Sequence, residues 1–328
     1  MSLATIILLS VAAAVLALHL YRQYWTYRDL PQMHTHAFPG ELFRVGRTYI
    51  ARRPARGGSR RSIVCFPGFL EDMCYFQALY EDCDCELLLV NNANYHCPFL
   101  DLEAQPLSWP ENPHALGSIE HDGFYLARIV EELARGSEIV LHGHSRGGAV
   151  VLAAGRLAPA LMRSRSVSAI LEAPVLPQGK TFGRSSKPIP NRLICYFMPL
   201  ALGVLRRSGP GLLLKMPMMR PTNPLKTRLC HSFSASARNY STCVVNVRDI
   251  VDWQRNNDID LYNNYPRIAV VIGARDDVLD RATMLASAEA GAALNEGVSI
   301  VHTEDTNHFI TLEQPHYLRT LARIRARC

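Results

Sequence analysis

A Gly-x-Ser-x-Gly pentapeptide, Gly143 to Gly147, constrains the fold of this chain more than any other feature. Residues 138–141 before it are predicted to form a short buried strand, and residues 149–154 after it a helix. Glycines on both sides of Ser145 allow a sharp turn between the two, which holds the serine hydroxyl in a strained, exposed position. The pattern therefore predicts that Ser145 is a nucleophile on a strand-to-helix turn.

A serine nucleophile needs a base to take its proton and a third group to orient that base. Where such a turn carries a nucleophile, the acid and then the histidine follow it in the chain. Asp276 follows a β-branched run at 268–272, and His308 follows the next predicted strand at 298–302. Each candidate thus comes just past a strand end, where open α/β sheets build their sites.

With these segments the chain resembles the α/β-hydrolase superfamily, specifically its capped, lipase- and esterase-like members. The resemblance covers about residues 41–325, apart from the region 174–262. It implies an α/β-hydrolase fold, with a mostly parallel central sheet flanked by helices and an inserted helical cap. In the family pattern the acid lies three residues after the glycine that ends its strand, here Asp276, and the base is here His308.

Other side chains could take the roles of acid and base. One glutamate ends a predicted strand at a place where some hydrolases carry their acid, and two more aspartates follow Asp276. One other histidine lies inside its strand and another inside the pentapeptide, with its ring directed away from the serine hydroxyl. His308 is the better placed base. The alternative acids are Asp277, Asp280 and Glu172, and the other histidines are His144 and His302.

Acyl transfer also requires two backbone N–H groups that stabilise an oxyanion. Arg146 follows the nucleophile and would supply one of them at the N-terminus of its helix. The other comes from the loop after the strand at 62–66, where the resemblance implies Phe69 as the donor. Pro67 departs from the common histidine at its position, which leaves the donor intact but removes a side chain that often braces this loop.

Sequence motifs typical of several other functions are missing from this chain. A serine rather than a carboxylate at the turn favours acyl transfer over dehalogenation. The phosphate-binding and dinucleotide-binding glycine motifs are missing, so no cofactor is expected. The nine cysteines form no C-x-x-C pair, and no metal site is expected. No stacking motif or reading helix accompanies the basic residues, so no nucleic acid is expected. The loose cluster considered for zinc is Cys83, Cys85, His96 and Cys97.

The N-terminus predicts a membrane segment. Residues 3–20 carry no charge, and an aromatic and basic stretch at 21–28 follows them. A signal peptide is the alternative, but it normally begins with a basic residue and ends at a small-residue site. We therefore expect an uncleaved single-pass anchor. The basic residues after it favour the cytoplasmic side, although short anchors also precede exported hydrolases and the side stays open.

The region 174–262 is expected to be a cap. Between residues 174 and 250 twelve Lys or Arg stand against the single acid Asp249, while the whole chain carries only +6. The apolar run 193–205, interrupted by Pro199, suits a helical hairpin over the active site or a segment in the headgroup region. The Met-rich stretch 212–219 could adapt to acyl chains. The alternative is a cap with a core of its own and a solvated basic face.

These observations predict a membrane-anchored serine hydrolase that cleaves carboxylic esters with hydrophobic acyl chains, such as lipids. Its catalytic residues would be Ser145, Asp276 and His308. An acyl thioesterase with the same residues is one alternative, and a non-catalytic membrane scaffold is another. The expected organisation is an anchor at 1–29, a hydrolase core at 30–173 and 263–328, and a cap at 174–262.

Overall fold

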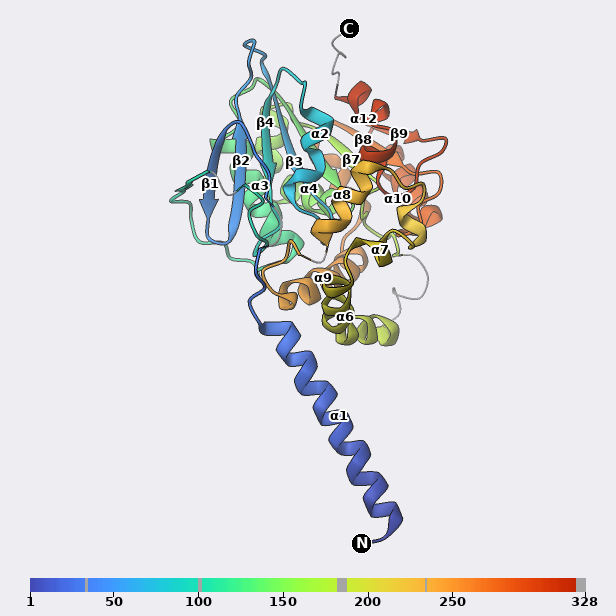
Figure 1. Ribbon diagram of the computed structural model, residues 1–328. Coiled ribbons are helices and arrows are strands. Elements are labelled where there is room, and N and C mark those ends of the chain that lie inside the picture. Colours follow the sequence, from blue (N-terminus) through green and yellow to red (C-terminus); the bar gives the residue numbers. More distant parts are fainter. Residues whose placement is uncertain (33–34, 100–101, 182–187, 234, 323–328) are drawn as a thin grey trace.

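A nine-stranded sheet forms the centre of the domain (Figure 1). The computed structural model describes residues 1–32, 35–99, 102–181, 188–233 and 235–322. The strand order is β5-β1-β2-β4-β3-β6-β7-β8-β9; β1, β2 and β4 pair antiparallel, and all other neighbours pair parallel. The strands are β1 (Glu41–Val45), β2 (Thr48–Arg53), β3 (Arg61–Phe66), β4 (Glu86–Val90), β5 (Ala104–Pro106), β6 (Glu138–His144), β7 (Ser168–Glu172), β8 (Arg267–Ile272) and β9 (Val298–His302).

Helices cover both faces of the sheet, so its central strands are apolar on both sides. In β4, Leu88 and Val90 pack into one core while Leu87 and Leu89 pack into the other, as the alternation of side chains along a strand requires. The first core is closed by α3 (Ile119–Glu132), α4 (Arg146–Leu157) and α10 (Arg281–Leu294), and the second by η1 (Met73–Phe76), α2 (Gln77–Tyr80), α11 (Ile310–Glu313) and α12 (His316–Leu321).

The mostly parallel sheet flanked by helices confirms the fold class expected from the sequence. The strands predicted at 268–272 and 298–302 are β8 and β9, within one residue. The chain order reverses between β3 and β6, because β4 lies beside one and β7 beside the other. A crevice opens at such a switch point, outside the carboxyl ends of the strands.

The turn after β6 forms because two glycines permit close backbone approach. A Cβ atom at Gly147 would lie 2.1 Å from the carbonyl oxygen of Phe66, and one at Gly143 would lie 2.3 Å from that of Gly147. Ser145 between them has a φ of 52°, a left-handed conformation that costs a non-glycine residue on the order of 1 kcal/mol or more. The strain predicted at the pentapeptide is therefore present.

Most of the described chain between β7 and β8 is helical, and we call this region the insert. Two of its basic residues, Arg184 and Lys187, lie outside the described residues. Its elements are α6 (Pro188–Ser208), α7 (Pro210–Leu213), η2 (Pro217–Met219), α8 (Pro224–Phe233), α9 (Tyr240–Asn256) and η3 (Ile259–Asn264).

The hairpin expected at 193–205 is wrong, because Pro199 lies inside the continuous helix α6. Proline removes one backbone hydrogen bond from a helix. The buried residues Cys195, Met198 and Leu202 share one face at helical spacing and pack against the domain. Their burial offsets the lost hydrogen bond and keeps the helix continuous.

Helix α1 (Leu3–Tyr27) projects away from the domain, on the side where α6 and α9 lie (Figure 1). In the described chain it is the one helix long and apolar enough to cross a membrane, and a signal sequence would fit the same description. Its apolar residues from Leu3 to Leu20 are exposed, whereas Trp25 is 3% exposed and stacks on Tyr240 of α9. The helix is thus apolar and uncovered for most of its length and attached to the domain at its C-terminal end.

Candidate active site

The three residues predicted to act in catalysis lie past the carboxyl ends of three parallel strands, β6, β8 and β9. Ser145 follows β6, Asp276 follows β8 and His308 follows β9. Their exposed fractions are 7%, 6% and 3%, so the serine is more enclosed than the sequence alone predicts. The side chains of Asp276 and His308 are in contact, because His308 Nδ1 lies 2.9 Å from Asp276 Oδ2.

Asp276 is held as a carboxylate. Its other oxygen accepts hydrogen bonds from the backbone N–H groups of Val278 and Leu279 at 2.8 and 2.9 Å. Burial raises the pKa of Asp276, but His308 and these N–H donors outweigh burial and leave the pKa below its usual value. An ionised Asp276 accepts the Nδ1 proton of His308, which leaves Nε2 as the free base.

None of the alternative acids bonds to His308 in the described structure. Asp277 Oδ2 accepts from the side chain of Asn307, and Asp280 caps the N-terminus of α10. Glu172 accepts from Tyr75, His142 and Thr311. The geometry therefore singles out Asp276 as the carboxylate beside the candidate base.

His144 links the serine turn to the His308 loop. Its Nε2 lies 3.0 Å from the backbone oxygen of His308, and the two rings are 4.9 Å apart between centroids. In the described chain no hydrogen bond joins the Ser145 hydroxyl to His308. The adjacent residue His144 nevertheless holds the two loops side by side.

The loop after β3 is braced by Glu71, a residue that the sequence analysis did not single out. Glu71 Oε2 accepts from the backbone N–H of Gly68 at 2.7 Å and from His144 Nδ1 at 2.8 Å. Pro67 has no side chain that could hydrogen-bond within this loop. The Glu71–His144 pair instead ties the loop to the residue before Ser145. Nothing local in the sequence signals this pair, because 73 positions separate the two residues.

Both ring nitrogens of His144 face acceptors, so both donate and the ring is an imidazolium. Burial lowers the pKa of His144, but the carboxylates of Glu71 and Glu172 outweigh burial and raise it to about 9. The pair is thus ionic at neutral pH.

Arg146 makes a second link to the same loop through its side chain. Its guanidinium donates to Asn92 Oδ1 at 2.8 Å and forms a buried ion pair with Asp122 at 2.7 Å. Asn92 Nδ2 in turn donates to the carbonyl oxygen of Gly68 at 2.9 Å. The segments that carry the two predicted oxyanion donors, Arg146 and Phe69, are therefore fixed relative to each other.

Glu172 is an internal hydrogen-bond acceptor beside this site. It accepts from the Tyr75 hydroxyl at 2.7 Å and from the backbone N–H of Thr311 at 2.6 Å. Burial raises its pKa, but the charge of His144 and the hydrogen bond from His142 lower the pKa to about 2. Because Thr311 comes three residues after His308, Glu172 holds the chain that carries the base.

The insert contacts the His308 loop from outside the sheet. Asn307 donates to the carbonyl oxygens of Pro217 and Arg220, both at 3.2 Å. Lys226 of α8 forms an ion pair with Glu313 at 2.6 Å, and both side chains are buried. These contacts hold the insert against the loop that carries His308.

The loose cysteine cluster gives no sign of metal binding. Cys83, Cys85 and Cys97 are free thiols, and His96 Nε2 lies 2.7 Å from the carbonyl oxygen of Leu30. Over the part of the chain that the structure describes, no group of three or more His, Cys, Asp or Glu could hold a metal ion.

Residues 63–320 match the alpha/beta hydrolase family, and the chain belongs to that family. Similar solved structures include a thermophilic esterase from Thermogutta terrifontis, with 18% identity and a TM-score of 0.58 over 90% of this chain and 97% of that one. MenH from S. aureus has 16% identity and a TM-score of 0.57, covering 84% and 96%. The N-acyl homoserine lactonase AidH has 14% identity and a TM-score of 0.57, covering 87% and 96%. At these identities the likeness shows the fold alone. No curated protein matches the chain.

The Glu71–His144 pair makes stability depend on pH. A histidine whose pKa rises on folding contributes stability that is complete below about pH 6.5 and is lost as the pH rises through about 9. We expect the free energy of unfolding to fall over this range by on the order of 3 kcal/mol, and this fall to be absent in Glu71→Gln. Urea unfolding at pH 6.5, 8 and 10 measures it. Glu131→Gln, which removes an exposed partner of Arg128, is the control; an equal flattening in both variants contradicts the assignment.

Proposed function

We propose that this protein is a serine hydrolase that cleaves carboxylic esters with hydrophobic acyl chains. The observation that carries the proposal is the buried Asp276–His308 pair beside a strained serine at a strand-to-helix turn. Family membership supports hydrolysis, and three of the similar structures carry the word esterase in their descriptions.

In the proposed reaction His308 Nε2 takes the proton of Ser145 Oγ as that oxygen attacks the carbonyl carbon of the ester. The backbone N–H groups of Phe69 and Arg146 stabilise the oxyanion that forms. His308 then gives its proton to the leaving alcohol, which departs and leaves an acyl group on Ser145. Water, deprotonated by His308, attacks the acyl-enzyme and releases the carboxylic acid. Asp276 stabilises the imidazolium in both halves.

The insert supports a preference for hydrophobic acyl chains. Its buried side chains share one core with Phe309 and Ile310, which directly follow the candidate base. Methionine in such a position adapts to flexible apolar groups. The insert residues in this core include Cys195, Met198, Leu202, Leu213, Met219, Leu229, Cys230, Phe233, Ala237, Tyr240 and Cys243.

We also propose that α1 is an uncleaved membrane anchor. A signal peptide is removed, whereas the last turns of α1 make specific contacts with the insert. Arg22 Nε donates to the carbonyl oxygen of Tyr196 at 2.8 Å, and a Cβ atom at Gly203 would lie 2.7 Å from the Trp25 ring. The basic residues after the apolar run favour a cytoplasmic catalytic domain.

Replacing the nucleophile separates an enzyme from a scaffold. Ser145→Ala should abolish covalent labelling by a fluorophosphonate probe and lower kcat for p-nitrophenyl butyrate by at least about 10⁴-fold. Asp276→Asn should keep some labelling and lower kcat by about 10³- to 10⁴-fold, because His308 loses its acceptor. Ser164→Ala, at an exposed serine of α5 (Pro159–Ser164), is the matched control. Undiminished labelling of Ser145→Ala would refute the proposed nucleophile.

Acyl-chain preference tests the substrate class. We expect kcat/KM to rise at least about tenfold from butyryl to long-chain p-nitrophenyl esters in detergent, since each buried CH₂ contributes about 0.8 kcal/mol. Turnover of short esters with none of long-chain or lipid esters would exclude the lipid part of the proposal. Faster turnover of matched acyl thioesters would favour a thioesterase.

The anchor predicts how the full chain behaves in cells. The protein should stay in the membrane fraction after alkaline carbonate extraction, and its intact mass should include residues 1–29. Recovery of a shorter, carbonate-soluble protein would identify α1 as a cleaved signal.

A further inference from the structure

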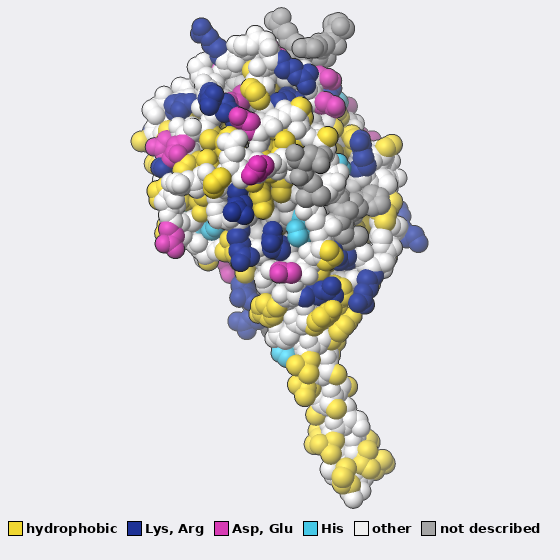
Figure 2. Space-filling model, turned by 60° about the vertical axis from the view of Figure 1, so that its left-hand side comes forward, with side chains coloured by type: hydrophobic (Ala, Val, Ile, Leu, Met, Phe, Trp, Pro, Cys, Tyr) yellow, Lys and Arg dark blue, Asp and Glu magenta, His cyan; other side chains and the backbone are white. Residues whose placement is uncertain are grey.

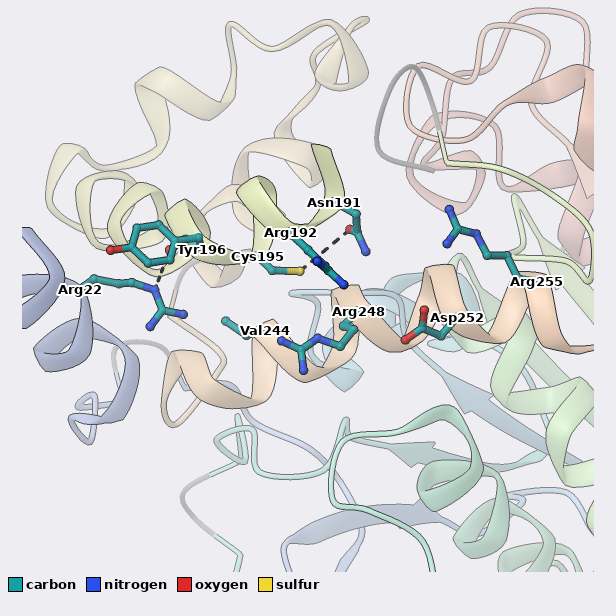
Figure 3. A pocket seen from close by; sticks show the side chains of 9 residues that line it. All are labelled: Arg22, Asn191, Arg192, Cys195, Tyr196, Val244, Arg248, Asp252 and Arg255. Carbon is teal, nitrogen blue, oxygen red and sulfur yellow. Dashed lines mark hydrogen bonds between the residues drawn. The ribbon is translucent and has the colours of Figure 1, made fainter. Parts of the chain in front are cut away.

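A cavity of about 570 Å³ lies between α1, α6 and α9, away from the candidate catalytic residues (Figure 3). We call it the arginine pocket. Four of its lining side chains are arginines, and a single acid, Asp252, lines it with them. The lining residues are Arg22, Asn191, Arg192, Cys195, Tyr196, Val244, Arg248, Asp252 and Arg255.

The arginines come from all three helices and differ in how they are held. Arg22 of α1 is fixed by its hydrogen bond to the Tyr196 carbonyl and lies with its guanidinium carbon 4.8 Å from the centre of the Tyr196 ring. Figure 3 shows Arg192 extending from α6 toward α9, the helix that carries Arg248.

Positive charge exceeds negative charge in this pocket, because four arginines line it with one aspartate. Within the described ranges no carboxylate lies within 4.0 Å of Arg192, Arg248 or Arg255, and Asp252 forms no ion pair. Guanidinium groups close together repel each other unless an anion lies between them. Planar guanidinium groups match the geometry of a phosphate, and several of them can donate to one phosphate at once.

The position of the pocket indicates where such an anion comes from. Arg22 lies two residues past Leu20, the end of the uncharged run 3–20. Figure 2 shows further basic side chains on the part of the domain from which α1 emerges. With residues 3–20 across a bilayer core, the arginine pocket lies at the level of the lipid phosphates.

We propose that the arginine pocket binds the phosphate of an anionic phospholipid in the membrane that α1 enters. Arg192, Arg248 and Arg255 bind the phosphate, while Cys195 and Val244 contact the less polar part of the headgroup. The inference rests on the proposed anchor and is independent of the proposed hydrolysis, because Ser145, Asp276 and His308 do not line the pocket.

Lipid retention by the full chain tests this site. The protein is purified in neutral detergent, incubated with mixed micelles of phosphatidylglycerol and phosphatidylcholine, and passed over a sizing column, and the retained lipids are quantified by mass spectrometry. We expect Arg192→Gln/Arg248→Gln to lower the ratio of retained phosphatidylglycerol to phosphatidylcholine at least about tenfold, since each basic residue near an anionic lipid contributes on the order of fivefold.

Arg163→Gln/Arg281→Gln is the matched control, because it removes the same charge from exposed positions on α5 and α10. The control should retain the wild-type ratio. An equal fall in both double variants, or no fall in either, overturns the pocket. Inorganic phosphate at constant ionic strength is tested as a competitor. If it displaces the lipid and raises the melting temperature as much as phosphatidylglycerol does, the ligand is free phosphate and the lipid assignment is wrong.

Two further measurements keep this test separate from the earlier proposals. Hydrolysis of p-nitrophenyl butyrate should be the same in wild type and both double variants, which also shows that they are folded. Carbonate extraction reports on the anchor alone. Loss of anionic-lipid preference by wild type, with anchoring and hydrolysis intact, therefore contradicts only the arginine pocket.

Discussion

The buried pair of Glu71 and His144 is the interaction on which the candidate site depends. It joins three loops: Glu71 accepts from the Gly68 N–H, and His144 donates to the carbonyl oxygen of His308. Removing one partner of a buried ion pair leaves an unpaired charge and costs on the order of 3 to 5 kcal/mol. The loop after β3, the serine turn and the His308 loop are therefore held in one arrangement, and a shift of one of them strains the other two.

The two carboxylates at the ends of β7 and β8 show how surroundings assign roles to similar groups. Both are ionised, but Glu172 accepts from Tyr75, His142 and Thr311, and the other ring nitrogen of His142 lies 2.7 Å from the Tyr80 hydroxyl. Asp276 bonds to a histidine whose other nitrogen is free. A carboxylate assists catalysis only if its histidine partner has a second ring nitrogen that can take a proton. Of these two carboxylates, only Asp276 has such a partner.

The fold and the candidate triad could be predicted because each rests on local patterns. Apolar runs give the strands, and Asp276 and His308 are conspicuous as polar residues directly after them. Glu71 and Asn92 could not be found in this way, since their partners lie far along the chain and only the parallel pairing of β3 with β4 and β6 brings them together. The prediction of a helical hairpin at Pro199 was wrong for a related reason. A local rule says that proline interrupts a helix, while burial of one face of α6 keeps this helix continuous.

The insert contacts both α1 and the loop that carries His308. One side of it holds α1 through Arg22 and Trp25, and another side covers the His308 loop through Asn307 and the buried Lys226–Glu313 pair. Ser145 is 7% exposed, so most of its surface is covered by neighbouring residues. The contacts to α1 and those to the His308 loop belong to one packed core, in which displacements are transmitted rather than absorbed. Helices α6 and α9, which border the arginine pocket, therefore share one packed core with Phe309 and Ile310 of the His308 loop.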